Sequence, residues 1–287
     1  MELGEKIKGM SLEAKIGQML FLGLPCNSVA ANTAVLGELR PGGMILFARD
    51  ISTTMEQTLV DLNTHRQTAE ACPPMFVGID QEGGRVSRLP VSWATKFPAA
   101  ADVGRNHNFA KALAKALGDE LAVLGINMNF APVLDVNSNP ENPVIGDRSF
   151  GTTASDVWAS GQQVIDGLTE AGIIPVIKHF PGHGDTSIDS HKALAIVTAN
   201  RELLESRELE PFRNAVCAGA PVVMVGHLLV PALDPEQPAH LSSRIISGLL
   251  REQWGFEGVV ITDDLEMGAV AQDRIGEVAV QAVQIGR

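Results

Sequence analysis

Apolar runs of strand length recur along the chain, and each is nearly continuous rather than alternating with polar residues. Continuous apolar character is typical of strands that are buried on both faces of a parallel sheet. The chain contains such runs at residues 17–24, 42–47, 75–79, 126–136, 173–177, 221–225 and 258–261.

Segments with helical periodicity separate these runs, so strand and helix alternate along the chain. Four of the segments are followed by a glycine, at Gly125, Gly172, Gly219 and Gly255, where a helix C-cap requires a positive φ. This alternation, with no linker rich in Ser, Pro or charge, predicts one domain over 1–287 that is a (β/α) barrel or a doubly wound sheet. The helical segments are 55–71, 109–124, 155–171, 201–218 and 243–254.

The end of the chain departs from a complete barrel of eight βα units. The seventh strand is followed by an amphipathic helix over 268–285, and the sequence stops at Arg287, so an eighth βα unit is absent. Either the sequence is C-terminally truncated, or the first and last strands leave an open seam of unpaired backbone groups. We expect truncation, because exposed strand edges promote aggregation.

Charge and composition exclude several classes of protein. With 45% hydrophobic and 20% charged residues the chain is globular, and its net charge of −12 argues against sequence-independent nucleic-acid binding, which needs a basic face. The most apolar stretch, residues 221–233, is interrupted by Gly, His and Pro. It is also shorter than the roughly 18 to 20 apolar residues of a membrane span, so we expect no membrane association.

The cysteines indicate the cellular compartment. Cys26, Cys72 and Cys217 form neither an even disulfide set nor a CxxC metal pattern, and the N-terminal residues lack the apolar segment of a signal peptide. Because these features favour a reducing compartment, we expect a cytoplasmic protein.

Polar residues gather where the predicted strands end, which is the edge at which barrel enzymes place their active sites. After the third strand, a glycine-rich loop holds Asp80, Glu82 and Arg88. The fourth strand ends at Asp135 and leads into a polar loop that contains Arg148. A solvated turn and a surface ion pair would account for these residues equally well, so they do not define a site by themselves.

The densest polar cluster follows the fifth strand, in residues 178–191, which contain three of the seven histidines. Pro and Gly in this segment exclude a helix, so it is a loop, and His179 and His183 do not share a helical face. The carboxylate of Asp189, two residues before His191, can hold one ring nitrogen and leave the other for proton transfer. We therefore predict a catalytic dyad of Asp189 and His191.

The seventh strand ends in two adjacent carboxylates, Asp263 and Asp264. A carboxylate at the end of a buried strand faces a dehydrated site, which is costly without a function. Alternation of side chains directs one of the two toward the mouth of the barrel and the other toward the helices, and alternation alone does not say which.

Four segments together closely resemble glycoside hydrolase family 3, in particular its β-N-acetylglucosaminidase branch, which works in peptidoglycan recycling. The resemblance extends through nearly the whole chain, and the strings KHFPGHGDT and DSH are specific to the family. It implies a (β/α)8 TIM-type barrel, here without the eighth βα unit, and exo-acting hydrolysis of terminal β-linked N-acetylglucosamine with retention of configuration. The segments are 78–88, 129–151, 178–191 and 261–267.

The resemblance also implies roles for individual residues. Asp263 matches the family's nucleophile, His191 its general acid/base, and Asp189 the carboxylate that orients this histidine. A β-N-acetylhexosaminidase of this kind needs neither a metal ion nor a cofactor, and we expect a monomer whose partner is a small carbohydrate. The residues that match the family's sugar-hydroxyl pocket are Asp80, Arg88, Arg148, Lys178 and His179.

The implied mechanism is double displacement through a covalent glycosyl-enzyme, in which Asp263 attacks the anomeric carbon while His191 protonates the departing oxygen. Retention by this route places the two groups roughly 5 to 5.5 Å apart. Because a neutral imidazole does not repel an anion, phosphate could compete with water as the acceptor.

Two other functions stay open at this point. A metal-dependent hydrolase is one, and a non-catalytic glycan-binding protein is the other, which the absent eighth unit suggests. Glu82 is a rival general acid that we rank below His191, and His227 either lines the pocket or is structural. The side chains that would bind the metal are those of His179, His183, Asp185, Asp189 and His191.

Overall fold

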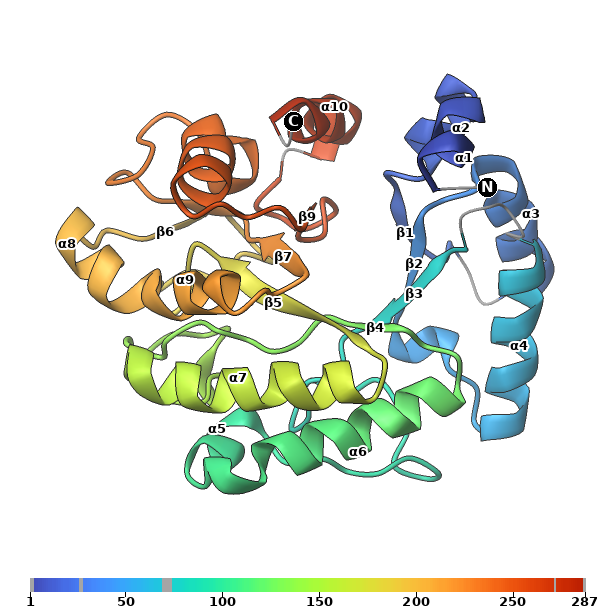
Figure 1. Ribbon diagram of the computed structural model, residues 1–287, viewed down its shortest axis with the longest axis horizontal. Helices are drawn as coiled ribbons and strands as arrows, with labels where there is room; N and C mark the ends of the chain where they lie inside the picture. The colour runs from blue at the N-terminus through green and yellow to red at the C-terminus, as the bar shows by residue number, and fades with distance from the viewer. Residues whose placement is uncertain (1–2, 26–27, 69–73, 271, 286–287) are drawn as a thin grey trace.

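A computed structural model of the protein describes residues 3–25, 28–68, 74–270 and 272–285. Within them, one curled sheet of seven parallel strands runs in the order β1, β2, β3, β4, β5, β7, β9 (Figure 1). Neighbours in the sheet follow the order of the chain, because a helical crossover returns each strand beside the previous one. The strands are β1 Phe21–Gly23, β2 Gly43–Leu46, β3 Phe76–Ile79, β4 Met128–Asn129, β5 Ile174–Phe180, β7 Val222–Val225 and β9 Val259–Thr262, and a separate parallel pair is formed by β6 Ala195–Ile196 and β8 Leu228–Leu229.

Helices cover the outer face of the sheet, with α3 and α4 beside β1 to β3, and with α6 and α7 below β4 and β5 (Figure 1). The α-helices are α1 Leu3–Gly9, α2 Leu12–Gly17, α3 Val29–Leu39, α4 Met55–Thr68, α5 Ala100–Gly104, α6 Ala110–Val123, α7 Ala154–Glu170, α8 Arg201–Leu203, α9 Glu210–Cys217 and α10 Ile275–Ile285. Two π-helices, η4 Leu204–Glu208 and η6 Arg244–Gln253, and five short 3-10 turns complete the set: η1 Ala48–Asp50, η2 His107–Phe109, η3 Gly146–Arg148, η5 Ala239–Leu241 and η7 Gln272–Arg274.

The prediction of a barrel without its eighth βα unit is confirmed. β1 and β9 are the two edges of the sheet, and no pairing joins them within the described residues. Val259 of β9 is 56% exposed, whereas β7 is buried along its whole length. The expectation that every strand is buried on both faces is therefore wrong at the edges, because an edge strand has a neighbour on one side only.

Aromatic rings pack over glycines on the inner face of the curled sheet. The rings of Phe21 and Phe130 meet edge to face, with centroids 5.4 Å apart. A Cβ at Gly43 would lie 2.2 Å from the ring of Phe21, and a Cβ at Gly78 would lie 2.7 Å from the ring of Phe130. The two glycines thus leave the space over the strands that the rings occupy.

Strand boundaries differ from the sequence prediction in two places. Residues 17–24 are not one strand, because Ser11 accepts the N–H of Ala14 and begins α2, which runs to Gly17. Residues 126–136 contain only the short β4, because Pro132 has no N–H to donate to a neighbouring strand, and pairing resumes with a single bridge at Val133.

The predicted helices also differ in form. The segment 201–218 is divided into α8, η4 and α9, because Pro211 cannot donate the backbone hydrogen bond that would continue a regular helix through it. The segment 243–254 is the π-helix η6. The last helix was predicted from Gly268 but α10 begins at Ile275, because the N–H groups of Gly268 and Ala269 bind another loop.

Other sequence predictions concern helix ends, cysteines and membranes. The glycines after the four helices all have positive φ, between 69 and 85°, as predicted for C-caps. The predicted helix end at 69–71 and the residues Cys26 and Cys72 lie outside the described residues, and Cys217 is exposed with its thiol free. In the part of the chain that the structure covers, no helix combines the length and the apolar character needed to cross a bilayer.

The packing between β5 and α9 generates a stability prediction. Phe212 in α9 is fully buried and meets Phe180 edge to face, with centroids 5.6 Å apart. We expect Phe212→Ala to lower the free energy of unfolding by about 3 to 5 kcal/mol, because the substitution leaves a cavity in the core. Phe109, which is 61% exposed, is the matched control. Phe109→Ala should change the free energy of unfolding by less than about 0.5 kcal/mol. Urea denaturation followed by circular dichroism measures both, and equal midpoints would contradict this account of the core.

Candidate active site

The carboxyl ends of β3, β5 and β9 bring the predicted site residues to one rim of the sheet. Asp80 directly follows β3, Lys178 and His179 lie at the end of β5, and Asp263 directly follows β9. Because the strands are parallel, these ends share one edge, which is where open α/β sheets and barrels bind their ligands.

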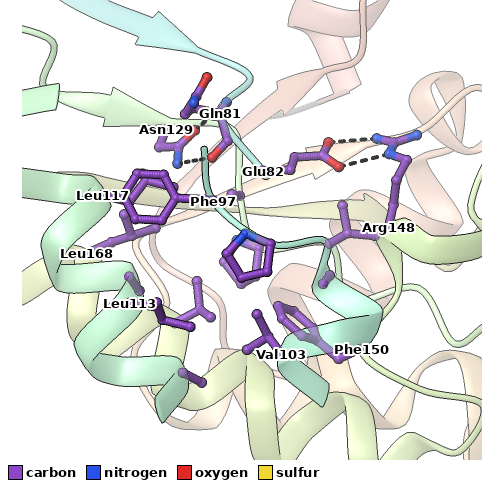
Figure 2. A pocket seen from close by; sticks show the side chains of 18 residues that line it. Gln81, Glu82, Phe97, Val103, Leu113, Leu117, Asn129, Arg148, Phe150 and Leu168 are labelled. Carbon is purple, nitrogen blue, oxygen red and sulfur yellow. Dashed lines mark hydrogen bonds and ion pairs between the residues drawn. The ribbon is translucent and has the colours of Figure 1, made fainter. Parts of the chain in front are cut away.

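A buried network of charges joins the loop after β3 to β5. The Nζ atom of Lys178 lies 2.6 Å from Asp80 Oδ1 and 2.7 Å from Glu82 Oε1. Arg148 donates to both carboxylate oxygens of Glu82, at 2.9 and 2.8 Å (Figure 2). Arg88 lies at the edge of the network, 3.6 Å from Asp80 Oδ2. The alternative of a surface ion pair is therefore wrong for Arg148, whose side chain is 10% exposed and whose partner is buried.

This network fixes the charge of Glu82. Burial works to raise the pKa of its carboxyl group, but Lys178 and Arg148 together hold that pKa well below its usual range. A carboxyl group that stays ionised has no proton to give, so Glu82 is poorly suited to be a general acid. The geometry therefore favours the ranking of Glu82 below His191.

Asp135 orients the histidine at the end of β5. Its fully buried carboxylate lies 2.6 Å from Nδ1 of His179 and accepts the backbone N–H groups of His179 and His183. Nε2 of His179 lies 3.3 Å from Arg148. Since a guanidinium only donates, this contact is satisfied when Nε2 accepts and Nδ1 carries the proton given to Asp135. The sequence analysis placed Asp135 at a strand end but did not identify this role.

The two carboxylates after β9 have different surroundings. The backbone N–H of Asp263 continues the pairing with β7 by donating to Val225 O. Burial works to raise the pKa of Asp263, but its interactions with His179, His227 and Lys178 hold that pKa below its usual value. Asp264 is exposed and its Oδ1 accepts the N–H of Glu266.

The dyad of Asp189 and His191 is formed as predicted. Nδ1 of His191 lies 2.8 Å from Asp189 Oδ1, which also accepts the backbone N–H of His191. Desolvation works to raise the pKa of Asp189, but the two hydrogen bonds from His191 lower it. The imidazole is 62% exposed, so its second ring nitrogen faces solvent.

The loop with the dyad is hydrogen-bonded to the loop that follows Asp263. The N–H of Gly268 donates to His191 O at 3.1 Å, and the N–H of Ala269 donates to Ser190 O at 3.2 Å. The structure thus brings Asp263 and His191 onto two adjoining loops.

The five residues of the metal hypothesis do not converge on one point: Asp189 and His191 pair with each other, and the other three have partners elsewhere. His183 uses Nδ1 for Thr186 and Nε2 for Ser190, and burial lowers its pKa to about 4. Asp185 lies 2.6 Å from Arg207. Among the residues that the structure describes, no group of three or more His, Cys, Asp or Glu side chains has the arrangement of a metal site. The side-chain geometry therefore does not support the metal-dependent hydrolase.

Comparison with known proteins assigns the chain to a family. The profile described as glycosyl hydrolase family 3 N terminal domain matches residues 11–286. The chain belongs to this family. β-Hexosaminidase LpqI of Mycobacterium tuberculosis is 36% identical to the family 3 chain, over 96% of the chain and 72% of LpqI. β-Hexosaminidase A of Pseudoalteromonas piscicida is 38% identical, over 80% of the chain and 42% of that relative.

Solved structures share the fold of the family 3 chain. A glycoside hydrolase family 3 β-N-acetylglucosaminidase from Paenibacillus sp. is 43% identical with a TM-score of 0.90, over 97% of this chain and 54% of that one. NagZ from Neisseria gonorrhoeae, in complex with N-trifluoroacetyl-D-glucosamine, is 30% identical with a TM-score of 0.84, over 93% and 79%. The chain thus spans about half the length of the Pseudoalteromonas and Paenibacillus proteins and more of the other two.

An apolar pocket of the family 3 chain lies beside the Glu82–Arg148 ion pair (Figure 2). Its walls include Phe97, Val103 and Leu117, and the ion pair forms one rim (Figure 2). A sugar presents hydroxyl groups that need polar partners, and most of the residues that line this pocket are apolar.

A pair of buried histidines lies beside Asp263. The rings of His227 and His240 are 4.3 Å apart, and Nε2 of His227 lies 2.9 Å from Asp264 O. The structure thus shows the hydrogen bond expected of a structural His227. Burial, and secondarily His227, lowers the pKa of His240 to about 3. The sequence analysis missed His240, because no nearby motif marks it.

The buried His240 predicts a pH dependence of stability. An unfolded histidine takes up a proton below about pH 6.5, whereas the folded protein keeps His240 neutral to about pH 3. The unfolded state then binds more protons, so this residue lowers the free energy of unfolding by about 2 kcal/mol between pH 7 and pH 5. We expect His240→Gln to lack this contribution. Urea denaturation of the wild type and the variant at pH 7 and pH 5 measures the free energy of unfolding. An equal drop from pH 7 to pH 5 in both proteins would contradict the buried, neutral state of His240.

Proposed function

We propose that this family 3 domain is an exo-acting β-N-acetylglucosaminidase that releases terminal β-linked N-acetylglucosamine with retention of configuration. The observation that carries the proposal is that Asp263 and the Asp189–His191 dyad lie on two hydrogen-bonded loops. The charges of Lys178 and His179 act on Asp263, and the dyad lies on the loop that follows these two residues at the end of β5. A nucleophile, a proton donor and polar groups for a sugar are the parts that such a reaction needs.

Exposure divides the charge network into two roles. The side chains of Arg88 and Asp80 are 30% and 17% exposed, so both can hydrogen-bond to sugar hydroxyls. Lys178 and Arg148 are 3% and 10% exposed, so they hold Asp80 and Glu82 in place, and in this proposal both also donate to the sugar hydroxyls. In this proposal His179 also belongs to the sugar pocket, beside Arg148.

The proposed reaction has two half-reactions. In the first, the Asp263 carboxylate bonds to the anomeric carbon while protonated His191 gives its Nε2 proton to the departing oxygen. Asp189 stabilises the imidazolium through Nδ1. In the second, neutral His191 takes a proton from water, which attacks the anomeric carbon and releases Asp263. The lowered pKa of Asp263 keeps it ionised for the attack.

The names of the relatives support the choice of sugar. Relatives of the chain are named β-hexosaminidases, and the gonococcal NagZ was solved with an N-acylated glucosamine derivative. On the resemblance to the peptidoglycan-recycling branch, we propose peptidoglycan fragments as the substrates and the cytoplasm as the location. A phosphate ion as acceptor in place of water belongs to the same proposal.

The first test removes the nucleophile. We expect Asp263→Asn to abolish hydrolysis of an aryl β-N-acetylglucosaminide, because an amide cannot form the glycosyl-enzyme. Asp264→Asn is the matched control, since the neighbouring side chain is exposed and caps a turn. Turnover is measured by release of the aryl group.

The stereochemistry and the sugar are read in the same assay. NMR of the wild-type reaction should show the β-anomer first, and an aryl β-glucoside should be the poorer substrate. Release of the α-anomer first, or wild-type turnover by Asp263→Asn, would contradict the mechanism. If the wild-type protein does not bind peptidoglycan fragments, the proposed substrate is wrong. If it binds them without any turnover, the result favours a glycan-binding protein.

The second test removes the proton donor. We expect His191→Ala to lower kcat/KM by about 10² to 10⁴ for an aryl group that leaves poorly, such as phenyl, which is the usual size of general-acid assistance. For a dinitrophenyl leaving group, which needs no protonation, kcat/KM should change little. An equal loss for both substrates would rule out His191 as the acid.

A further inference from the structure

The position of His191 depends on its backbone. The ring is 62% exposed, and its hydrogen bond among the described residues is to Asp189, two residues away on the same loop. The dyad is therefore a local pair within residues 189–191, and more than half of the imidazole is open to solvent. Contacts to the backbone of this segment must set where the proton donor lies.

The loop after β9 supplies those contacts. Gly268 and Ala269 donate their N–H groups to the carbonyl oxygens of His191 and Ser190, at 3.1 and 3.2 Å. From the other side, Ser190 Oγ lies 2.9 Å from Nε2 of the buried His183. The segment is thus held between the nucleophile's loop and the buried end of its own loop.

Only a glycine fits at position 268. A Cβ there would lie 2.7 Å from His191 O and 2.9 Å from Lys192 O. Both atoms belong to the backbone, so a side chain at this position would displace the dyad segment rather than a flexible side chain. The carbonyl oxygen of His191 is both the atom nearest to such a Cβ and the acceptor of the Gly268 N–H.

A short turn connects this contact to Asp263. The N–H of Met267 donates to Asp264 O, and the same oxygen lies 2.9 Å from Nε2 of the buried His227. The turn between Asp263 and Gly268 is therefore anchored by hydrogen bonds. It links the residue that carries the carboxylate to the residue that contacts the dyad segment.

We infer that Gly268 is a positioning residue for the acid/base, which sets the place of His191 relative to Asp263 through backbone contact. This inference rests on the proposed function, because it assigns to the contact the task of aligning the two reacting groups. Gly268 touches neither the sugar nor the reacting atoms, and it acts through His191.

Gly268→Ala tests the inference. We expect kcat/KM for the phenyl β-N-acetylglucosaminide to fall by about 10- to 100-fold, the usual cost of displacing a catalytic group by about 1 Å. For the dinitrophenyl substrate, kcat/KM should stay within about threefold, because its departure needs no acid. Gly276→Ala is the matched control, since a Cβ at Gly276 in α10 meets no atom within 4 Å. It should retain wild-type values for both substrates.

A double-mutant cycle separates positioning from a structural effect. If Gly268 acts through His191, adding Gly268→Ala to His191→Ala should cause no further loss with the phenyl substrate. Equal losses of kcat/KM with the two substrates, or additive losses in the cycle, would overturn the inference. A failure of His191→Ala itself to distinguish the two leaving groups would instead overturn the proposed function.

A second variant guards against misfolding. Thermal unfolding followed by circular dichroism reports whether Gly268→Ala keeps the fold. Ala269→Pro removes the N–H that reaches Ser190 O without adding a Cβ at position 268. It should show the same dependence on the leaving group, and a folded variant with wild-type kcat/KM for both substrates would contradict the inference.

Discussion

Charges that are buried at the end of the sheet must be paired, and this constraint organises the molecule. The Asp135 carboxylate is fully buried and accepts hydrogen bonds from backbone N–H groups at the end of β5 and in the loop beyond it. Lys178 is almost as deeply buried and satisfies its charge with two carboxylates from the loop after β3. Removing one member of such a set would leave its partner charged and unpaired in a dry site. The loops at the rim are therefore held in one arrangement by pairing requirements.

The architecture follows from the sequence because it depends on local signals. Continuous apolar runs predict a parallel sheet, and the glycines after four helices mark their ends, as at Gly125 and Gly172. The π-helices were not predicted, since their wider turns have the same apolar spacing as ordinary helices over short segments. Gly268 was assigned to a helix, because nothing in its own segment reveals a loop about 80 residues earlier that accepts its N–H.

The candidate site divides along the same line. The dyad was predictable because Asp189 and His191 are two residues apart and bond to each other. The pairing of Arg148 with Glu82 joins residues that are 66 positions apart, and that of Asp135 with His179 joins residues 44 apart. Such partners are selected by the fold, so residue type alone leaves a surface ion pair as the simpler interpretation. The resemblance to family 3 selected Arg148 and His179, and coordinates were needed to find Asp135 and to show what holds each residue.

The exposure of the His191 imidazole has a kinetic consequence. In the proposed mechanism this imidazole, which is 62% exposed, can exchange protons with the buffer between turnovers. The proton taken from one acceptor water need not then be the one given to the next leaving group. In deuterated water, this ring nitrogen would thus exchange its proton for deuterium between turnovers. A carboxylic acid enclosed in the protein would exchange more slowly.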